Sequence, residues 1–289
     1  MNDQNFVSVI VPTYKDGRSL QKCLHALQAQ TYSKESFEVI VVNNDAEAID
    51  LNIALPPNAT LIHESKPGSY SARNKGIDHA KGEIFAFTDA DCIPSQDWIQ
   101  KSVAELQNGH DRIAGHVRVF GEKKNRTLGE AYEFVLAFDQ KNNAQSGNSV
   151  TANLVCWRYC FDHTGLFNTE MLSGGDIEWN YRATKAGLSI KYAPDAVVYH
   201  PARDSIGKIF RKRRRTAGGF PVLSRHNRTR FWFIIGIMPP VFAFRMILYS
   251  KRITVKEKIA LLPISYLIEL YSTFTKTAIR DGWLEPSRR

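Results

Sequence analysis

Short apolar runs rich in β-branched residues alternate with helical patterns through the first third of the chain. Residues 7–11 and 37–42 are two such runs, and Pro12 and Asn43 stop them. Between them, residues 19–30 carry apolar side chains at helical spacing: Leu20, Cys23, Leu24 and Leu27. Strands and helices that alternate at these lengths predict an α/β fold with a mostly parallel, doubly wound sheet of the Rossmann-like type.

Polar side chains follow the predicted strands. Residues 61–63 predict a short third strand, residues 69–79 a helix, and residues 83–87 a strand that leads into an acidic turn. In such sheets, ligands bind beyond the carboxyl ends of the strands. The side chains at these ends are therefore expected to share one crevice: Tyr14, Asn43, Asn44, Asp89 and Asp91.

The middle of the chain is less regular. Residues 132–138 fit a helix or a strand, and residues 141–149 are polar and rich in Gly and Asn, which predicts a loop. Residues 150–158 are expected to pair with the main sheet. Residues 189–192 and 196–200 predict two short strands, the second of which ends at a histidine.

The acidic turn is a candidate metal site. Asp89 and Asp91 lie one residue apart, directly after a predicted buried strand. Mg²⁺ and Mn²⁺ prefer carboxylate oxygens and often share their remaining positions with substrate phosphates. A solvated acidic turn is the common alternative for two such residues on their own.

A second acidic pair lies downstream. Asp176 and Glu178 follow Gly174 and Gly175 and open a predicted helix over residues 176–185. Acidic residues in the first turn of a helix compensate its dipole, so the pair alone has a structural explanation. Together with the upstream acidic turn, it instead favours an enzyme that handles a phosphorylated substrate.

Composition limits the remaining classes. The chain has 289 residues, 43% of them hydrophobic and 23% charged, which is enough for one α/β core and an appendage. The four cysteines show no zinc-ligand spacing and are expected to be reduced. The first residues lack the features of a signal peptide, so we expect a cytosolic catalytic domain.

The net charge of +9 is concentrated in one region. Residues 211–215 read Arg-Lys-Arg-Arg-Arg, and residues 231–249 downstream are nearly all apolar. A basic block near an apolar stretch favours an anionic membrane surface, and the scarcity of stacking aromatics around the block argues against nucleic acid. Prolines and charges interrupt the apolar stretch and the next one, residues 255–279, so we favour in-plane or re-entrant helices. Spanning helices and a buried soluble subdomain remain alternatives. The predicted domains are therefore 1–204, catalytic, and 205–289, membrane-associating.

Several segments together resemble the family-2 glycosyltransferases, which are inverting enzymes with the GT-A fold. The segments that carry this resemblance span most of residues 7–201: Val-Ser-Val-Ile-Val-Pro-Thr-Tyr at 7–14, Val-Val-Asn-Asn at 41–44, Ala-Arg-Asn-Lys-Gly at 72–76, Asp-Ala-Asp at 89–91 and Gly-Asp-Ile-Glu at 175–178. Two departures are that Asn44 stands where Asp is commoner and Gly175 where Glu is usual.

The resemblance implies a role for each matching position. It implies that Asp91, Asp89 and His200 bind Mn²⁺ or Mg²⁺ and that Asp176 is the general base. For the nucleotide, the positions implied are Pro12, Tyr14, Asn44, Arg73, Asp89 and Asp91. For the acceptor, they are Asn153, Trp157 and Glu178.

The expected reaction moves a sugar from a nucleoside-diphosphate sugar, with UDP as the expected nucleotide, to a lipid-linked or membrane-proximal glycan acceptor. Residues 227–231 do not match the Gln-x-x-Arg-Trp motif of processive synthases, so we expect one or few additions in surface polysaccharide synthesis. The expected location is the cytoplasmic face of the plasma membrane, and a homodimer is compatible with the sequence. The alternative is a catalytically silent scaffold or nucleotide-binding subunit of a polysaccharide synthesis complex.

Overall fold

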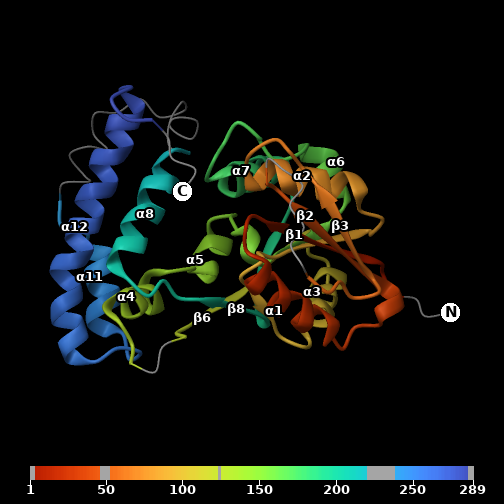
Figure 1. Cartoon of the computed structure of the whole chain (residues 1–289), viewed down its shortest axis with the longest axis horizontal. Coiled ribbons are helices and arrows are strands. Elements are labelled where there is room, and N and C mark those ends of the chain that lie inside the picture. The colour runs from red at the N-terminus through yellow and green to blue at the C-terminus, as the bar shows by residue number, and fades with distance from the viewer. Residues whose placement is uncertain (1–3, 46–52, 123–124, 220–237, 286–289) are drawn as a thin grey trace. The chain divides into compact units, whose positions relative to one another are not determined.

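The computed structural model describes residues 4–45, 53–122, 125–219 and 238–285 (Figure 1). Its contacts divide the chain into two compact units. The first unit comprises Met1–Arg118, Asp139–Thr169 and Gly175–His200, and the second comprises Val119–Phe138, Glu170–Gly174 and Pro201–Arg289. Part of the predicted apolar stretch, residues 231–237, lies outside the described residues, as do residues 227–230.

An eight-stranded sheet in the order β3-β2-β1-β4-β7-β6-β8-β5 forms the centre of the fold. Strands β3, β2, β1 and β4 are parallel, and β7 runs antiparallel to both β4 and β6. The strand bounds are β1 Val7–Thr13, β2 Phe37–Asn43, β3 Ala59–His63, β4 Ile84–Phe87, β5 Ile93–Pro94, β6 Arg112–Phe120, β7 Leu154–Trp157 and β8 Ile190–Pro201. The predicted α/β fold with a doubly wound parallel sheet is confirmed for the half that β1 to β4 build.

Helices cover both faces of this parallel half (Figure 1). Their bounds in the first unit are α1 Gly17–Gln28, α2 Ser69–His79, α3 Trp98–Gln107, α5 Gln140–Gln145, α6 Tyr159–Thr164 and α7 Gly175–Lys185, with 3₁₀ turns at Lys34–Ser36 and Thr151–Asn153. Helix α1 begins at Gly17, before the predicted start at residue 19, because the Asp16 side chain accepts a hydrogen bond from Ser19 N and caps the helix. Its predicted stripe, Leu20, Cys23, Leu24 and Leu27, is fully buried.

The middle segments differ in part from expectation. The ambiguous residues 132–138 fall mostly in a helix, α4 (Leu128–Leu136), which Thr127 and Glu130 start with a capping box. The polar stretch expected as a loop contains the short helix α5, capped by Asp139. The two short strands expected near residue 195 form one continuous strand, β8.

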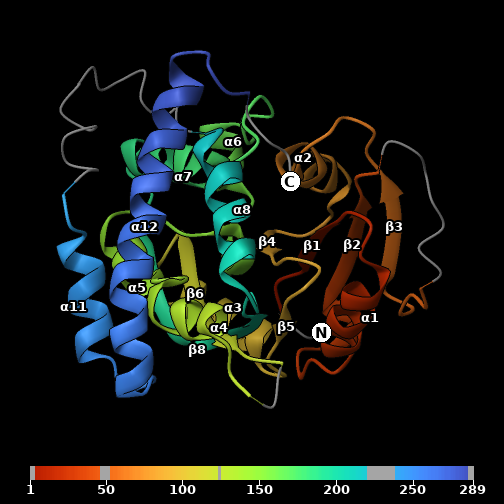
Figure 2. The ribbon, with the colours of Figure 1, turned by 60° about the vertical axis from the view of Figure 1, so that its left-hand side comes forward.

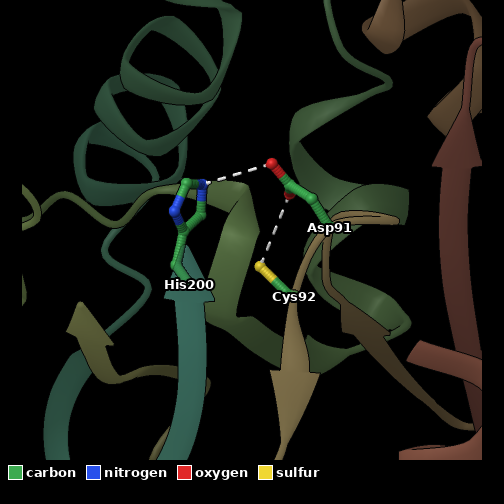
Figure 3. A group of neighbouring side chains, drawn as sticks. All are labelled: Asp91, Cys92 and His200. Carbon is green, nitrogen blue, oxygen red and sulfur yellow. Dashed lines mark hydrogen bonds and ion pairs between the residues drawn. The ribbon is translucent and has the colours of Figure 1, made fainter. Parts of the chain in front are cut away.

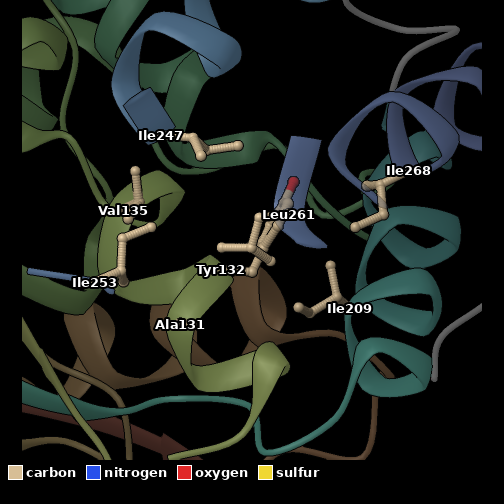
Figure 4. Packing of buried hydrophobic residues seen from close by; sticks show 8 residues of the cluster. All are labelled: Ala131, Tyr132, Val135, Ile209, Ile247, Ile253, Leu261 and Ile268. Carbon is tan, nitrogen blue, oxygen red and sulfur yellow. The ribbon is translucent and has the colours of Figure 1, made fainter. Parts of the chain in front are cut away.

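Four helices of the second unit surround a hydrophobic core of their own (Figures 2 and 4). They are α4, α8 (Ile206–Ala217), α11 (Val241–Tyr249) and α12 (Val255–Arg280), with α12 lying between α8 and α11. The buried cluster they share is Ala131, Tyr132, Val135, Ile209, Ile247, Ile253, Leu261 and Ile268. Residues from 205 onward are therefore mainly helical where the structure describes them.

The basic block lies on α8 and is split between two environments. Lys212 and Arg203 approach the buried carboxylate of Glu133 at 3.4 and 2.8 Å, and Arg213 donates a hydrogen bond to the Tyr132 hydroxyl at 3.1 Å. Burial alone would raise the pKa of Glu133, but the two cations outweigh burial and hold that pKa below its usual value. The remaining arginines of the block are exposed: Arg211, Arg214 and Arg215.

Helix α12 carries large apolar side chains on its outer side as well as in the core. Its inner side buries Leu261 and Ile268 together with small hydroxyl residues such as Ser265, which donates a hydrogen bond to a carbonyl of its own helix. On the outer side, Ile259, Leu267 and Phe274 are 68%, 57% and 61% exposed. A helix whose outer side met only water would carry mostly polar residues there. Within the described residues, the structure contains no helix with both the length and the apolar character that crossing a membrane requires.

Candidate active site

Parallel pairing brings the ends of β1, β2 and β4 to one edge of the sheet. Thr13 pairs with Asn43, and Ile10 pairs with Phe87, the last residue of β4. Pro12 and Tyr14 therefore lie at the end of β1, Asn44 follows β2, and the acidic turn with Asp89 and Asp91 follows β4. The side chains expected to share a crevice thus come from neighbouring strand ends.

Asp89 is held by an arginine from helix α2. Arg73 Nη2 lies 2.5 Å from Asp89 Oδ1, and the Arg73 side chain is only 4% exposed. A buried guanidinium is costly unless a carboxylate pairs with it, so this pair fixes both side chains. Arg73 therefore orients Asp89, and its expected contact with the nucleotide stays a prediction.

Asp91 and His200 come together with a third side chain, Cys92 (Figure 3). His200 Nε2 lies 3.7 Å from Asp91 Oδ2, and Cys92 Sγ lies 4.0 Å from Asp91 Oδ1. The ligand atoms of the three residues all fall within 4.8 Å of one another. A carboxylate oxygen and an imidazole nitrogen are suitable donors for a divalent cation such as Mn²⁺. Burial, followed by the nearby charges of Asp89 and Asp91, raises the pKa of the Cys92 thiol well above its usual value.

Asp176 opens helix α7 and receives hydrogen bonds on both carboxylate oxygens. The Tyr70 hydroxyl donates to Oδ1 at 3.1 Å, and Thr151 N donates to Oδ2 at 3.4 Å. Burial is the main reason that the pKa of Tyr70 is raised, so its hydroxyl keeps its proton and acts as a donor. The carboxylate is thus oriented by neighbours and remains partly accessible.

One helix connects the two acidic centres. Tyr70 and Arg73 are three residues apart on α2 and so lie on the same side of it. The Arg73 guanidinium lies 5.6 Å from the centre of the Tyr70 ring. Tyr70 contacts Asp176 and Arg73 contacts Asp89, so α2 sets where both carboxylates stand.

The same tyrosine explains a departure from the family pattern. A Cβ atom at Gly175 would lie 2.8 Å from a carbon of the Tyr70 ring. The ring also packs against Phe167, with centroids 5.7 Å apart, so it has little freedom to withdraw. The Tyr70 ring therefore leaves no room for a side chain at position 175, which explains the glycine there.

Glu178, expected at the acceptor, is paired within its own helix. Arg182 Nε and Nη2 donate to its two oxygens at 2.7 and 3.0 Å. Arg182 also donates to the carbonyls of Thr164 and Leu166. The pair thus anchors the segment after α6 to α7, and a contact of Glu178 with an acceptor stays a prediction.

The amide of Asn44 is engaged with a neighbouring loop. It donates to the carbonyls of Glu64 and Lys66, both at 2.8 Å, and accepts from Gly68 N at 2.8 Å. The next residue, Asp45, is buried, and within the described residues its Oδ1 has no hydrogen-bond partner. Sequence reasoning missed Asp45, although an acidic residue directly after the Asn-Asn pair was a usable signal.

Two residues expected at the acceptor have other contacts, and their role at an acceptor stays a prediction. Asn153 is fully buried, and its amide bonds Trp98 Nε1 and the carbonyls of His116 and Ala196. These bonds tie core elements together. Trp157 pairs with Ile84 at the start of β4, because β7 is antiparallel, and so lies about 10 Å from the edge where the acidic turn begins.

The α/β fold with an acidic turn, a histidine and a second carboxylate at a helix start is the arrangement expected of a GT-A-type enzyme. The chain belongs to glycosyl transferase family 2, whose sequence model matches residues 8–164. The glycosyltransferase AglE of Haloferax volcanii is 34% identical over 250 residues, which are 81% of this chain and 82% of that protein. The protein is accordingly a glycosyltransferase.

More distant relatives agree with this assignment. A Methanococcus voltae protein, named dolichyl N-acetyl-alpha-D-glucosaminyl phosphate 3-beta-D-2,3-diacetamido-2,3-dideoxy-beta-D-glucuronosyltransferase, is 22% identical over 72% of this chain and 70% of its own length. Among solved structures, the mannosyltransferase PcManGT from Pyrobaculum calidifontis, in complex with GDP-Man and Mn²⁺, has a TM-score of 0.61 at 18% identity. That match covers 96% of this chain and 88% of PcManGT. It supports the fold.

The contact between Gly175 and Tyr70 yields a prediction about stability. Gly175→Ala is expected to lower the free energy of unfolding by about 1–3 kcal/mol, because the added methyl group overpacks a site whose neighbour cannot move away. In a Tyr70→Ala background the same change should cost clearly less, since the ring is gone. Urea denaturation of the unaltered protein, the two single variants and the double variant measures the cost of Gly175→Ala with and without the tyrosine ring.

Gly207→Ala is the matched control, because Gly207 is also helical and a Cβ there would meet nothing within 4 Å. It should leave stability equal or higher. An equal loss for Gly175→Ala in both backgrounds would show that the tyrosine ring is not what requires glycine.

Proposed function

We propose that the protein is a metal-dependent, inverting glycosyltransferase that moves a sugar from a nucleoside-diphosphate sugar to a lipid-linked or membrane-proximal glycan acceptor. The observation that carries this proposal is the arrangement around α2, where Arg73 holds Asp89 and Tyr70 holds Asp176. The names of two similar proteins support it, since one is solved with GDP-Man and Mn²⁺ and the other is named as a glucuronosyltransferase of dolichyl N-acetyl-alpha-D-glucosaminyl phosphate. UDP stays our expectation for the nucleotide.

Asp91 and His200 are the residues that would hold the cation, with Asp89 close by in the same turn. Their oxygen and nitrogen donors fit Mn²⁺ or Mg²⁺. When bound, such an ion supplies charge stabilisation for the diphosphate that leaves the sugar. Arg73 pairs with Asp89 and offsets its negative charge. The acidic turn therefore repels a diphosphate less than two aspartates without a paired arginine would.

Asp176 is the proposed general base. Its carboxylate takes the proton of the acceptor hydroxyl as that oxygen attacks the anomeric carbon from the side opposite the diphosphate, which inverts the configuration. Tyr70 and Thr151 N fix the orientation of the carboxylate before the acceptor arrives.

Substitutions of Asp176 and of Asp91 are expected to affect different steps, sugar transfer and nucleotide binding respectively. Asp176→Asn removes the base but keeps the shape of the side chain, so turnover should fall by about 10²–10⁴-fold while nucleotide binding is retained. Asp91→Ala should abolish transfer by weakening Mn²⁺-dependent binding of the nucleoside diphosphate. Asp78→Asn, an exposed aspartate on α2, is the matched control and should stay active.

Transfer assays and calorimetric titration of nucleoside diphosphate with Mn²⁺ measure these outcomes. Normal turnover in Asp176→Asn would remove this residue from the role of base. Failure of the unaltered protein to bind any nucleoside diphosphate would instead favour the silent scaffold.

We further propose that residues 205–289 lie on an anionic membrane surface and that residues 1–204 carry catalysis. The outward apolar side of α12, together with exposed Phe242 and Tyr249 on α11, supports this, because such side chains are favourable at the boundary of headgroups and acyl chains. The exposed arginines of α8 suit anionic headgroups. The in-plane arrangement, the cytoplasmic face, a homodimer and few additions per acceptor stay predictions.

Vesicle flotation tests the membrane surface. The full chain should float with vesicles containing phosphatidylglycerol, and Leu267→Asp or Phe274→Asp should reduce this. Replacing Arg211, Arg214 and Arg215 by Gln should weaken binding by about 1 kcal/mol for each arginine near the surface, with a smaller loss in high salt.

Leu55→Asp supplies the control, since Leu55 is an exposed leucine (39%) of the first unit. Its effect should be small. The proposed membrane surface would be contradicted if the full chain did not float with anionic vesicles. An equal loss of flotation for Leu55→Asp and Leu267→Asp would contradict it as well.

A further inference from the structure

Cys92 is a buried thiol that the proposed transfer reaction does not use. Its side chain is fully buried, and its sulfur points toward the same space as the Asp91 carboxylate and the His200 imidazole (Figure 3). These residues come from two places in the chain, the turn after β4 and the end of β8. The resemblance to the family assigns no role to this thiol.

The local backbone explains why two consecutive residues face one point. Adjacent side chains of an extended strand point to opposite sides. Residues 90 and 91 instead form a turn, closed by a hydrogen bond from Cys92 N to Asp89 O at 3.0 Å. The turn therefore lets the Asp91 carboxylate and the Cys92 sulfur point toward the same position, beside His200.

One sulfur, one nitrogen and one oxygen form a donor set different from that of a magnesium site. Mg²⁺ and Mn²⁺ favour oxygen donors, whereas Zn²⁺ and Co²⁺ also accept a thiolate. Bond lengths at tetrahedral zinc imply that its ligand atoms lie about 3.3–3.5 Å apart. One ligand atom from each of Asp91, Cys92 and His200 lies within 4.8 Å of the other two, so a shift of about 1 Å would bring the three to that spacing.

We propose that Cys92 joins Asp91 and His200 as the third protein ligand of a thiophilic divalent cation, of which Zn²⁺ is the physiological example. As the metal–sulfur bond forms, the thiol proton passes to solvent. The inference rests on the proposed function in that Asp91 and His200 are also the proposed Mn²⁺ ligands. Zinc and manganese therefore compete for one place, and zinc acts as an inhibitor of transfer.

Cobalt(II) is the probe, because a cobalt–thiolate bond gives a charge-transfer absorption band in the near ultraviolet. The unaltered full chain titrated with Co²⁺ should develop this band, and Zn²⁺ should displace it. Cys92→Ser should bind Co²⁺ without the band and should need on the order of tenfold to a hundredfold more Zn²⁺ to displace Mn²⁺, a loss typical of changes around metal ligands.

Cys23→Ser is the matched control, because Cys23 is a buried thiol influenced by the same two aspartates yet outside the group of converging ligand atoms. It should keep the band. Mn²⁺ binding, followed by the loss of the free-ion resonance signal, should change less than Zn²⁺ binding in Cys92→Ser.

The outcomes separate this inference from the proposed function. Uptake of Co²⁺ by the unaltered protein without a thiolate band would overturn the role of Cys92 and leave the Mn²⁺ site standing. Absence of both Co²⁺ and Mn²⁺ binding would overturn the metal site itself. If Cys92→Ser weakened Zn²⁺ binding and Mn²⁺ binding equally, the thiol would have a structural role only. If the variant does not fold, the thiolate band of the unaltered protein still tests the inference.

Discussion

A buried cation on helix α2 constrains the active site. The Arg73 guanidinium is nearly excluded from water, and Asp89 is the carboxylate that pairs with it. Removing one partner of such a pair leaves an uncompensated charge at a cost of about 3–5 kcal/mol, so the acidic turn is fixed to α2. Tyr70 on the same side of the helix extends this constraint to Asp176. The position of one helix therefore determines the positions of two carboxylates that are far apart in the sequence.

The sequence predicted the parts of the fold that rest on local patterns. Strands β1, β2 and β4, the stripe of α1 and the acidic turn follow from apolar spacing and from residues that stop strands. Tertiary features were not visible in it. No local pattern shows that β7 runs antiparallel, which pairs Trp157 with Ile84. The three partners of Asn153 come from distant segments, so its burial could not be predicted either.

The candidate site was predictable in outline only. Spacing drew attention to Asp89, Asp91 and Asp176, but it gave no sign of Tyr70, whose hydroxyl reaches Asp176 across 106 positions of sequence. Cys92 was judged by its spacing to other cysteines, whereas its neighbours in space are an aspartate and a histidine. The basic block on α8 was treated as a single surface, although two of its five residues, Lys212 and Arg213, contact Glu133 and Tyr132 within the second unit.

The central claim is that the cation and the general base serve one bound donor. A crystal structure with a nucleoside diphosphate and Mn²⁺, with the metal located by its anomalous scattering, tests this most directly. We expect a manganese peak within bonding distance of Asp91 and of a diphosphate oxygen, with the Asp176 carboxylate lining the same cavity. A manganese peak bound elsewhere, or an Asp176 that opens onto a separate surface, would contradict it.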